Sequence, residues 1–426
     1  MTEIINAFPG YEYVNGKNMY RGIDVGKGGY VYHESNVYAN IALLDVQSMH
    51  PHSIIGLNAF GEYTQNFKDM LDARIAIKHG EFDRAKNMLD GKLAPYLTDK
   101  SKAKDLSNAL KTALNSCYGL TAASFDNPMR DIRNKNNIVA LKGALFMKTL
   151  QDEVQKRGFT VCHIKTDSIK IANATPEIIN FVMDFAKPYG YKFEHEATYD
   201  RMCLVNGSTY IAKYASTEWC MKTYGYVPDD NAKAEEKNEM WTATAKQFQV
   251  PYVFKTLFTK EPIKFDDLCE SCEVKTAMYL DNNENLPEGK HDYKFIGKVG
   301  SFCPIKPGRG GAELVKEAKD SDGNIKYDSV TGTKGYRWLE SEYVKLLGKE
   351  DDIDKSYYRR LVDEAIYGSG TGKNRKPGIS DFCDFEQFVS DEPFTPDALG
   401  TLPEHPLDDD ELPWYEDEEL ENFKRR

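Results

Sequence analysis

The sequence contains no run of 18 or more apolar residues, and its opening residues MTEIINAFPG lack the basic and apolar segments of a signal peptide. We therefore expect neither a membrane-spanning helix nor a secretory leader. Cysteine is also sparse, with eight residues scattered over a chain of 426. Such spacing excludes a disulfide framework and fits a reducing, cytoplasmic location. Cys269 and Cys272 form only half of a zinc motif, so they predict no metal site by themselves.

A net positive charge is missing too, since the chain carries a formal charge of −12. Nine of its acids lie between Asp408 and Glu421, a segment without a single base. Setting these nine aside leaves a charge of −3 for the remainder. A local basic groove is therefore compatible with the sequence, and whole-chain charge does not exclude a nucleic-acid partner. We expect the acidic segment 401–426 to be disordered.

Hydrophobic periodicity predicts a mixed α+β fold in which strands and helices alternate without regular βαβ spacing. Short strands and turns are expected before residue 40, and the composition changes at a domain boundary near 235–245. Beyond that boundary we expect more helix, followed by glycine-rich loops. The expected strands cover 41–46, 160–173, 191–196 and 202–214, and the expected helices cover 66–89 (broken near Gly80), 99–118, 136–156 and 176–187.

Two aspartates follow apolar strand segments and are the first candidates for chemistry. Asp45 ends the run IALLD, and Asp167 follows HIKT. Either aspartate alone is equally explained as a turn or capping residue. Together, two carboxylates from separate strands offer the oxygen ligands that Mg²⁺ prefers.

A third element lies between the two aspartates, on the predicted helix 99–118. Lys111 and Asn115 are four residues apart, and Tyr118 lies one turn further along. Such a face can offer an ammonium to a triphosphate, with an amide and an aromatic ring for a base or sugar. The simpler interpretation of the segment alone is a surface lysine on a helix that ends at Gly119.

The order and types of these three segments resemble the family B (polymerase alpha-like) DNA polymerases, and more closely those of bacterial viruses. The first family motif, Asp-x-x-Ser-Leu-Tyr-Pro-Ser, is matched by Asp45 to His52. The second, Lys-x-x-x-Asn-Ser-x-Tyr-Gly, is matched at every specified position by Lys111 to Gly119. The third, Asp-Thr-Asp-Ser, is matched by Lys165 to Ser168. The resemblance runs from about Gly26 to Tyr214.

The resemblance implies a right-hand polymerase with an antiparallel palm, short helical fingers and a thumb. It implies a catalytic role for Asp45, Asp167 and Lys111, with two Mg²⁺ ions (Mn²⁺ can substitute) held by both aspartates and the Val46 carbonyl. The dNTP would contact Val46, Ser48, Met49, His50, Arg74, Lys78, Asn115 and Tyr118. Primer-template DNA would contact Gly28, Gly29, Thr166, Tyr210 and Lys213.

The same resemblance divides the chain into parts. It implies a template-side segment at 1–40, palm at 41–65 and 119–235, fingers at 66–118 and thumb at 236–400. Only 44 residues precede Asp45, so we expect no proofreading domain here. An exonuclease would be absent or supplied by a separate polypeptide, such as one that carries the N-terminal half.

Three departures from the family pattern leave other functions open. His50 stands where the family has a tyrosine that blocks the sugar 2′-hydroxyl. Lys165 replaces the first aspartate of the third motif and could pair with a phosphate or with Glu196. Ser208 stands where the primer-contacting lysine belongs. A primer-making polymerase that tolerates ribonucleotides, or a non-catalytic subunit that binds primer-template, therefore remains an alternative.

Overall fold

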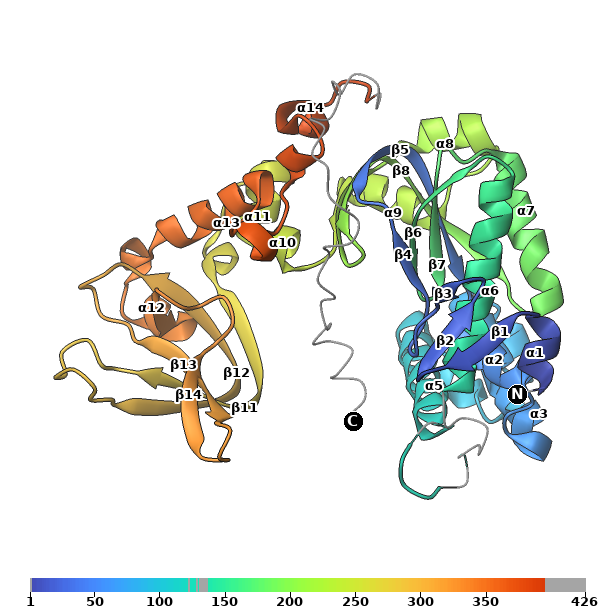
Figure 1. Ribbon diagram of the computed structural model, residues 1–426, viewed down its shortest axis with the longest axis horizontal. Coiled ribbons are helices and arrows are strands. Elements are labelled where there is room, and N and C mark those ends of the chain that lie inside the picture. Colours follow the sequence, from blue (N-terminus) through green and yellow to red (C-terminus); the bar gives the residue numbers. More distant parts are fainter. Residues whose placement is uncertain (1, 122, 128, 130–136, 395–426) are drawn as a thin grey trace. The chain divides into compact units, whose positions relative to one another are not determined.

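The computed structural model describes residues 2–121, 123–127, 129 and 137–394 (Figure 1). The chain divides into two compact units. Among the described residues, the first contains those up to Gly207 and Lys213–Met240, and the second contains Ser208–Ala212 and Trp241–Phe394. The chain therefore enters the second unit twice. The acidic segment predicted at 401–426 lies outside the described residues.

The largest sheet has seven strands in the order β10-β9-β8-β5-β7-β6-β4. Its long central strands β5 and β8 are antiparallel, and so are the pairs β5–β7, β6–β7 and β4–β6. The strands are β4 (Val31–His33), β5 (Asn36–Val46), β6 (Thr160–Lys165), β7 (Ser168–Ala172), β8 (Phe193–Asn206), β9 (Thr209–Tyr214) and β10 (Trp241–Ala243). A separate small sheet contains β1 (Tyr11–Val14), β2 (Lys17–Tyr20) and β3 (Ile23–Asp24).

One face of the large sheet is covered by α6 and α7, which Figure 1 shows running alongside the strands. α6 is apolar on almost every side, because it packs against both the sheet and α2. A Cβ on Gly143 would lie 2.6 Å from Met49 Sδ, so this glycine lets α2 and α6 approach closely. The helices of the first unit are α1 (Thr2–Ala7), α2 (Met49–Gly56), α3 (Thr64–Lys78), α4 (Phe82–Ala85), α5 (Lys100–Thr121), α6 (Ile138–Lys156), α7 (Pro176–Ala186), α8 (Thr217–Tyr224) and α9 (Asp229–Lys237).

A second, smaller core lies between α3, α4 and α5. It contains Ala73, Ala76, Ile77, Ala85, Leu93, Leu97, Ala103 and Leu110. Small alanines on α3 let the two long helices pack closely. This helical part therefore has apolar packing of its own beside the main core.

The second unit contains a five-stranded antiparallel sheet in the order β14-β13-β11-β12-β15. Here the prediction of a glycine-rich loop was wrong for the segment GKVGSFCPI, because all of it lies within the long strand β12. The strands are β11 (Glu270–Asp281), β12 (Tyr293–Ile305), β13 (Glu313–Lys319), β14 (Ile325–Ser329) and β15 (Arg337–Glu340). The helices are α10 (Lys246–Gln249), α11 (Pro251–Phe254), α12 (Ser341–Leu346), α13 (Lys355–Tyr367) and α14 (Phe385–Val389).

The fold is α+β with antiparallel sheets, as the sequence predicts. The expected helix 66–89 is indeed interrupted at Gly80, which has a φ of 75°. The expected single strand 160–173 is wrong, because β6 and β7 form a hairpin there. Among the described residues, no helix combines the length and apolar character needed to span a bilayer.

Candidate active site

Asp45 and Asp167 lie side by side at one edge of the large sheet. Asp45 is the penultimate residue of β5 and pairs with Ser168, the first residue of β7. Asp167 lies in the β6–β7 turn, and its carbonyl oxygen accepts a 2.8 Å hydrogen bond from the Val46 N–H. The structure thus brings Asp167 next to Asp45 and Val46, although it lies far from both in sequence.

The turn that carries Asp167 has an unusual backbone. Thr166 has a φ of 57°, which is rare for a β-branched residue. Its N–H donates to the Tyr30 carbonyl at 2.9 Å. A Cβ on Gly29 would lie 2.9 Å from Thr166 Oγ1, so only glycine fits beside this turn. The Gly28–Gly29 loop therefore packs against the residue before Asp167.

Two glutamates complete a cluster of four carboxyl groups. Glu194 on β8 pairs directly with Asp45, and Glu196 follows two residues later on the same side of the strand. Burial raises the pKa of Asp45 to about 8, and the neighbouring charges of Asp167, Glu196 and Glu194 contribute. Burial also raises the pKa of Asp167 and of Glu196. Removal from water is thus the main reason that these three carboxyl groups resist ionisation.

Two lysines, Lys78 and Lys170, lie near the carboxyl cluster. On one side, Lys78 forms an ion pair with Glu194 (Nζ to Oε2, 3.1 Å), and Gln47 Nε2 donates to the other carboxylate oxygen at 2.7 Å. On the other side lies Lys170 of β7, which is 3% exposed and donates to His163 Nδ1 at 3.2 Å. Neither lysine forms an ion pair with Asp45 or Asp167 in the part of the chain that the structure describes.

Among the described residues, no group of three or more His, Cys, Asp or Glu side chains is placed to hold a metal ion. A Mg²⁺ ion that binds with its substrate needs only one or two carboxylates from the protein, because phosphates and waters supply its other ligands. The residues that would hold such an ion are Asp45 and Asp167, with the Val46 carbonyl as a further oxygen.

The N-terminus of α2 and the α3 side chain Arg74 form the next part of the site. Ser48 precedes α2 in a left-handed conformation (φ 56°, ψ 56°), and no side chain caps the helix. Arg74 Nη1 donates to Ser48 Oγ at 3.2 Å. Arg74 Nε is buried without a hydrogen-bond partner, and burial lowers the pKa of the guanidinium. A helix N-terminus beside an incompletely paired arginine can bind an anion such as phosphate.

His50 and Tyr118 form a flat aromatic surface. Their rings stack with centroids 4.3 Å apart and an interplanar angle of 7°. The Tyr118 hydroxyl and the Asn137 side-chain amide are within hydrogen-bond distance of one another. Burial lowers the pKa of His50 to about 4, so the ring is neutral, and its buried Nδ1 has no partner.

The remaining predicted residues lie in less confined positions. Lys111 and Asn115 are exposed on α5, the helix that also carries Tyr118. Lys165 is exposed at the end of β6. Tyr210 lies in β9, where its N–H donates to Thr244 Oγ1 at 3.0 Å, and Lys213 lies three residues further on. No hydrogen bond or ion pair among the described residues joins these five side chains to the carboxyl cluster.

Sequence reasoning missed Glu194, Lys170 and His163. The sequence did contain a signal for Glu194. In FEHEATYD, Glu194 and Glu196 are two residues apart, and this spacing predicts both side chains on one face of a strand. Lys170 and His163 gave no comparable signal. Their importance comes from the β6–β7 pairing, which places them opposite one another.

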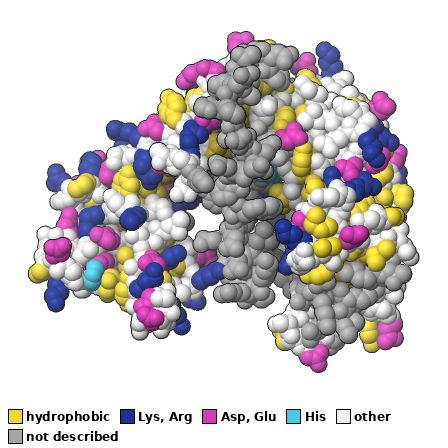
Figure 2. All heavy atoms as spheres, in the orientation of Figure 1, with side chains coloured by type: hydrophobic (Ala, Val, Ile, Leu, Met, Phe, Trp, Pro, Cys, Tyr) yellow, Lys and Arg dark blue, Asp and Glu magenta, His cyan; other side chains and the backbone are white. Residues whose placement is uncertain are grey.

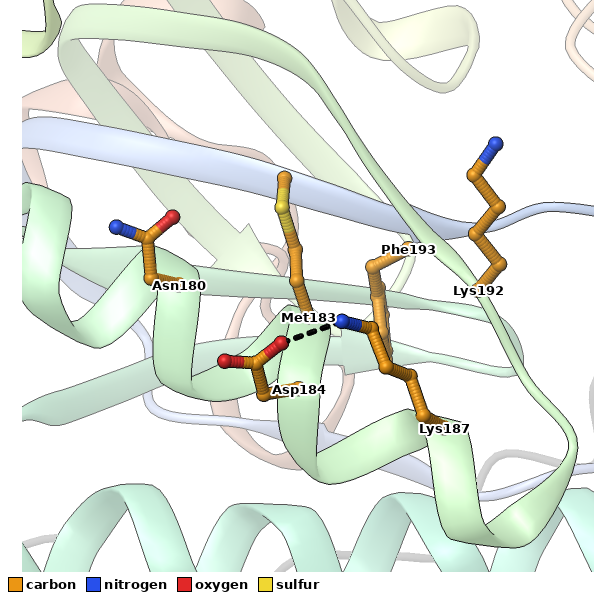
Figure 3. A pocket seen from close by; sticks show the side chains of 6 residues that line it. All are labelled: Asn180, Met183, Asp184, Lys187, Lys192 and Phe193. Atoms are coloured by element: carbon orange, nitrogen blue, oxygen red, sulfur yellow. Dashed lines mark hydrogen bonds and ion pairs between the residues drawn. The ribbon is translucent and has the colours of Figure 1, made fainter.

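A surface pocket on the first unit has none of these residues in its lining. It is lined by Asn180, Met183, Asp184, Lys187, Lys192 and Phe193 (Figure 3). In the close-up, Asp184 and Lys187 point toward one another and form a 2.6 Å ion pair. On the face drawn in Figure 2, basic and acidic side chains are interspersed over the described surface.

No family model matches the chain, and no curated protein matches it. A solved structure of the family B DNA polymerase from the hyperthermophilic archaeon Pyrobaculum calidifontis is similar over 80% of this chain and 46% of that chain. The sequence identity is 10% and the TM-score is 0.38. This chain therefore spans less than half the length of that solved structure, and a likeness at this level decides neither its fold family nor its activity.

Proposed function

We propose that the chain is a template-directed DNA polymerase that adds dNTPs to a primer 3′-hydroxyl. The observation that carries the proposal is the meeting of Asp45 and Asp167 at one sheet edge, beside an anion site made by Arg74 and the start of α2. The three sequence motifs that resemble family B polymerases contribute these same residues. The large sheet would be the palm, α3 to α5 the fingers and the second unit the thumb.

Each part of the site would have its own role in binding or catalysis. Arg74 and the N-terminus of α2 would bind the triphosphate, with Lys111 offering a further ammonium. The stacked rings of His50 and Tyr118 would support the sugar and base. Two Mg²⁺ ions on Asp45 and Asp167, when bound, would activate the primer hydroxyl and stabilise charge on the leaving pyrophosphate. Gly28, Gly29 and Thr166 would contact DNA beside the aspartates, and Tyr210 and Lys213 would contact it from β9.

The decisive experiment is extension of a labelled primer on a longer DNA template with Mg²⁺ and dNTPs. Asp167→Asn should abolish lengthening while the chain stays folded, because the substitution keeps the shape of the side chain and removes its charge. Asp184→Asn is the matched control, since Asp184 is an exposed aspartate of the same unit that pairs with Lys187. Extension by Asp167→Asn at the rate of the control would exclude the proposal. Binding of primer-template without extension by the unaltered chain would favour the non-catalytic subunit.

A polymerase that accepts ribonucleotides is the second candidate, and His50 is the observation that favours it. A neutral imidazole with a buried, unbonded Nδ1 is smaller than a tyrosine ring and could accept a hydrogen bond from a sugar hydroxyl. We expect His50→Tyr to lower rNTP use relative to dNTP use by roughly tenfold or more, because the larger ring excludes the 2′-hydroxyl. The ratio of the two kcat/KM values measures this directly. An unchanged ratio would remove the steric explanation.

A further inference from the structure

Two cysteines of the second unit face one another across neighbouring strands. β11 and β12 are antiparallel, and Glu270, the first residue of β11, pairs with Phe302. Cys269 precedes Glu270 and has an extended backbone (φ −112°, ψ 116°), so the same register places it opposite Cys303. The Sγ atoms of Cys269 and Cys303 are 3.7 Å apart.

This arrangement suits a disulfide bond. Facing residues of an antiparallel pair have Cα atoms about 4.5–5.5 Å apart, which is within the range that a disulfide spans. A bonded pair of sulfurs is about 2.0 Å apart, so Cys269 and Cys303 need a movement of about 1.7 Å between their sulfurs. Rotation about the Cα–Cβ bonds supplies such a movement while the strands stay paired.

The sequence alone favours a different partner for Cys269. Cys269 and Cys272 are separated by two residues, the spacing of many dithiol sites. In the structure, Cys272 lies within β11 opposite Gly300, and three residues along a strand place its side chain on the other face from that of Cys269. Nor do the cysteines of the described residues belong to a group of three or more side chains that could hold a metal ion.

The two thiols differ in exposure. Cys303 is 0% exposed, whereas Cys269 is half-buried, so an oxidant reaches Cys269 first. Burial raises the pKa of both thiols, which keeps them protonated and slow to react at neutral pH. At Cys269, the Cys303 thiol, the Ser341 hydroxyl and the charge of Lys345 lower the pKa, while Asp266 raises it.

We propose that Cys269 and Cys303 form a reversible disulfide with a small disulfide oxidant such as oxidised glutathione, and that this bond stabilises the pairing of β11 with β12. The Cys269 thiolate attacks one sulfur of the oxidant, whose S–S bond breaks, and the first glutathione leaves and takes up a proton. The Cys303 thiolate then attacks the Cys269 sulfur, forms the protein disulfide and releases the second glutathione, which also takes up a proton. Two protein thiols are thus oxidised and one oxidant molecule is reduced to two thiols. The proposal does not depend on the proposed polymerase function.

The test is oxidation of the folded full chain with oxidised glutathione. The remaining thiols are blocked with iodoacetamide, the chain is digested without reductant, and the linked peptides are identified by mass spectrometry. The main linked peptide should join Cys269 to Cys303, and dithiothreitol should remove the link. A peptide that joins Cys269 to Cys272, or Cys269 found only as a mixed disulfide with glutathione, would overturn the proposal.

Serine variants locate the reaction. Cys303→Ser should stop at the mixed disulfide of Cys269 with glutathione, because the second thiol is missing. Cys272→Ser is the matched control, since it removes a neighbouring thiol from the other face of the same strand, and it should form the Cys269–Cys303 link as the unaltered chain does. Loss of the link in a folded Cys272→Ser chain would contradict the pairing.

Hydrogen exchange measures the stabilising effect. The β11 amides of the oxidised chain should exchange at least about tenfold more slowly than those of the reduced chain, because a bond between the strands restricts the unfolded segment. The Cys303→Ser chain should show no such slowing when the same oxidant is added. Exchange that is equally fast in the linked and the reduced chain would overturn the stabilising role.

Discussion

Half-buried acids in the first unit and buried acids in the second have different surroundings. In the second unit, Glu270 pairs with Lys246 at 2.8 Å, and Asp267 pairs with Lys255 at 2.9 Å. In the first unit, Asp45, Asp167 and Glu196 form no ion pair with any lysine or arginine that the structure describes. Removing a carboxylate from water is costly unless a partner offsets it. The acids of the second unit are therefore compensated by ion pairs, whereas those of the first keep a desolvation cost that the cation of the proposed polymerase site would offset.

The largest effect should come from Asp45→Asn. We expect primer extension to fall by roughly 10³-fold or more, because a carboxylate at the reacting centre is lost. The metal-free first unit should at the same time become more stable, since the folded state no longer has to hold a proton that the unfolded chain releases. Extension rates and hydrogen exchange of the β5 amides measure the two effects. Loss of both activity and stability would mean that Asp45 is a structural acid like those of the second unit.

The pH dependence of stability gives a second test of whether the acids of the first unit are less well compensated than those of the second. The pKa of Asp45 is about 8 in the folded chain, above its ordinary value of 3.8. The folded state therefore holds a proton that the unfolded state releases, and stability should decline as pH rises from about 4 to 8. We expect a loss on the order of 2 kcal/mol in the metal-free first unit.

Hydrogen exchange of the β5 amides across this pH range, with a chelator present, measures that decline. Asp45→Asn should flatten it, because no titrating proton remains. Added Mg²⁺ should flatten it too, since binding to the folded state offsets the cost of ionisation. A stability that rises between pH 4 and 8 would show that Asp45 is well compensated.

Two arginines extend the comparison to positive charge. Arg74 in the first unit has a buried Nε without a partner, whereas Arg360 in the second pairs with Glu364 and Tyr336. Arg74→Gln should raise KM for dNTP about 30-fold through loss of a charge-assisted contact, with little change in stability. Arg360→Gln should lower stability by roughly 1 kcal/mol and leave KM unchanged. Steady-state kinetics and denaturant unfolding distinguish them, and the reverse pattern would contradict the assignment of the anion site.

A small effect on stability alone should come from Glu270→Gln. This substitution leaves a buried amide where a carboxylate met Lys246, and should lower the stability of the second unit by about 1–2 kcal/mol. Hydrogen exchange of the β11 amides measures the loss. Because Lys246 is largely exposed, it can return to water. A gain in stability would place Glu270 with the acids of the first unit.

The sequence predicted helices better than strands, for a physical reason. α3 and α5 bury one face each, and the 3.6-residue period makes that face visible in sequence. The β6–β7 hairpin was hidden because Thr166, a β-branched residue, adopts the left-handed turn that normally requires glycine or asparagine. β12 was mistaken for a loop because it contains Gly297 and Gly300, the latter where a Cβ would lie 2.6 Å from the ring of Phe302.

For the candidate site, the motifs identified the residues that lie at strand and helix ends. They could not identify groups that strand pairing alone brings near, such as Glu194 opposite Asp45 and Lys170 opposite His163. Their neighbours come from distant segments, so no local spacing marks them. The charged groups that surround Asp45 and Asp167 can therefore be identified only from the folded structure.

Two separate segments of the chain belong to the second unit. The position at which the protein is cut therefore matters. A fragment that ends at Met240 would keep Ser208–Ala212 but lose Thr244, whose side chain and backbone N–H bond to Tyr210. Those backbone groups would be left on an open strand edge, which favours aggregation. Separate production of the two halves should therefore fail for a cut at 240, and recombination between relatives at that point should yield insoluble chimeras.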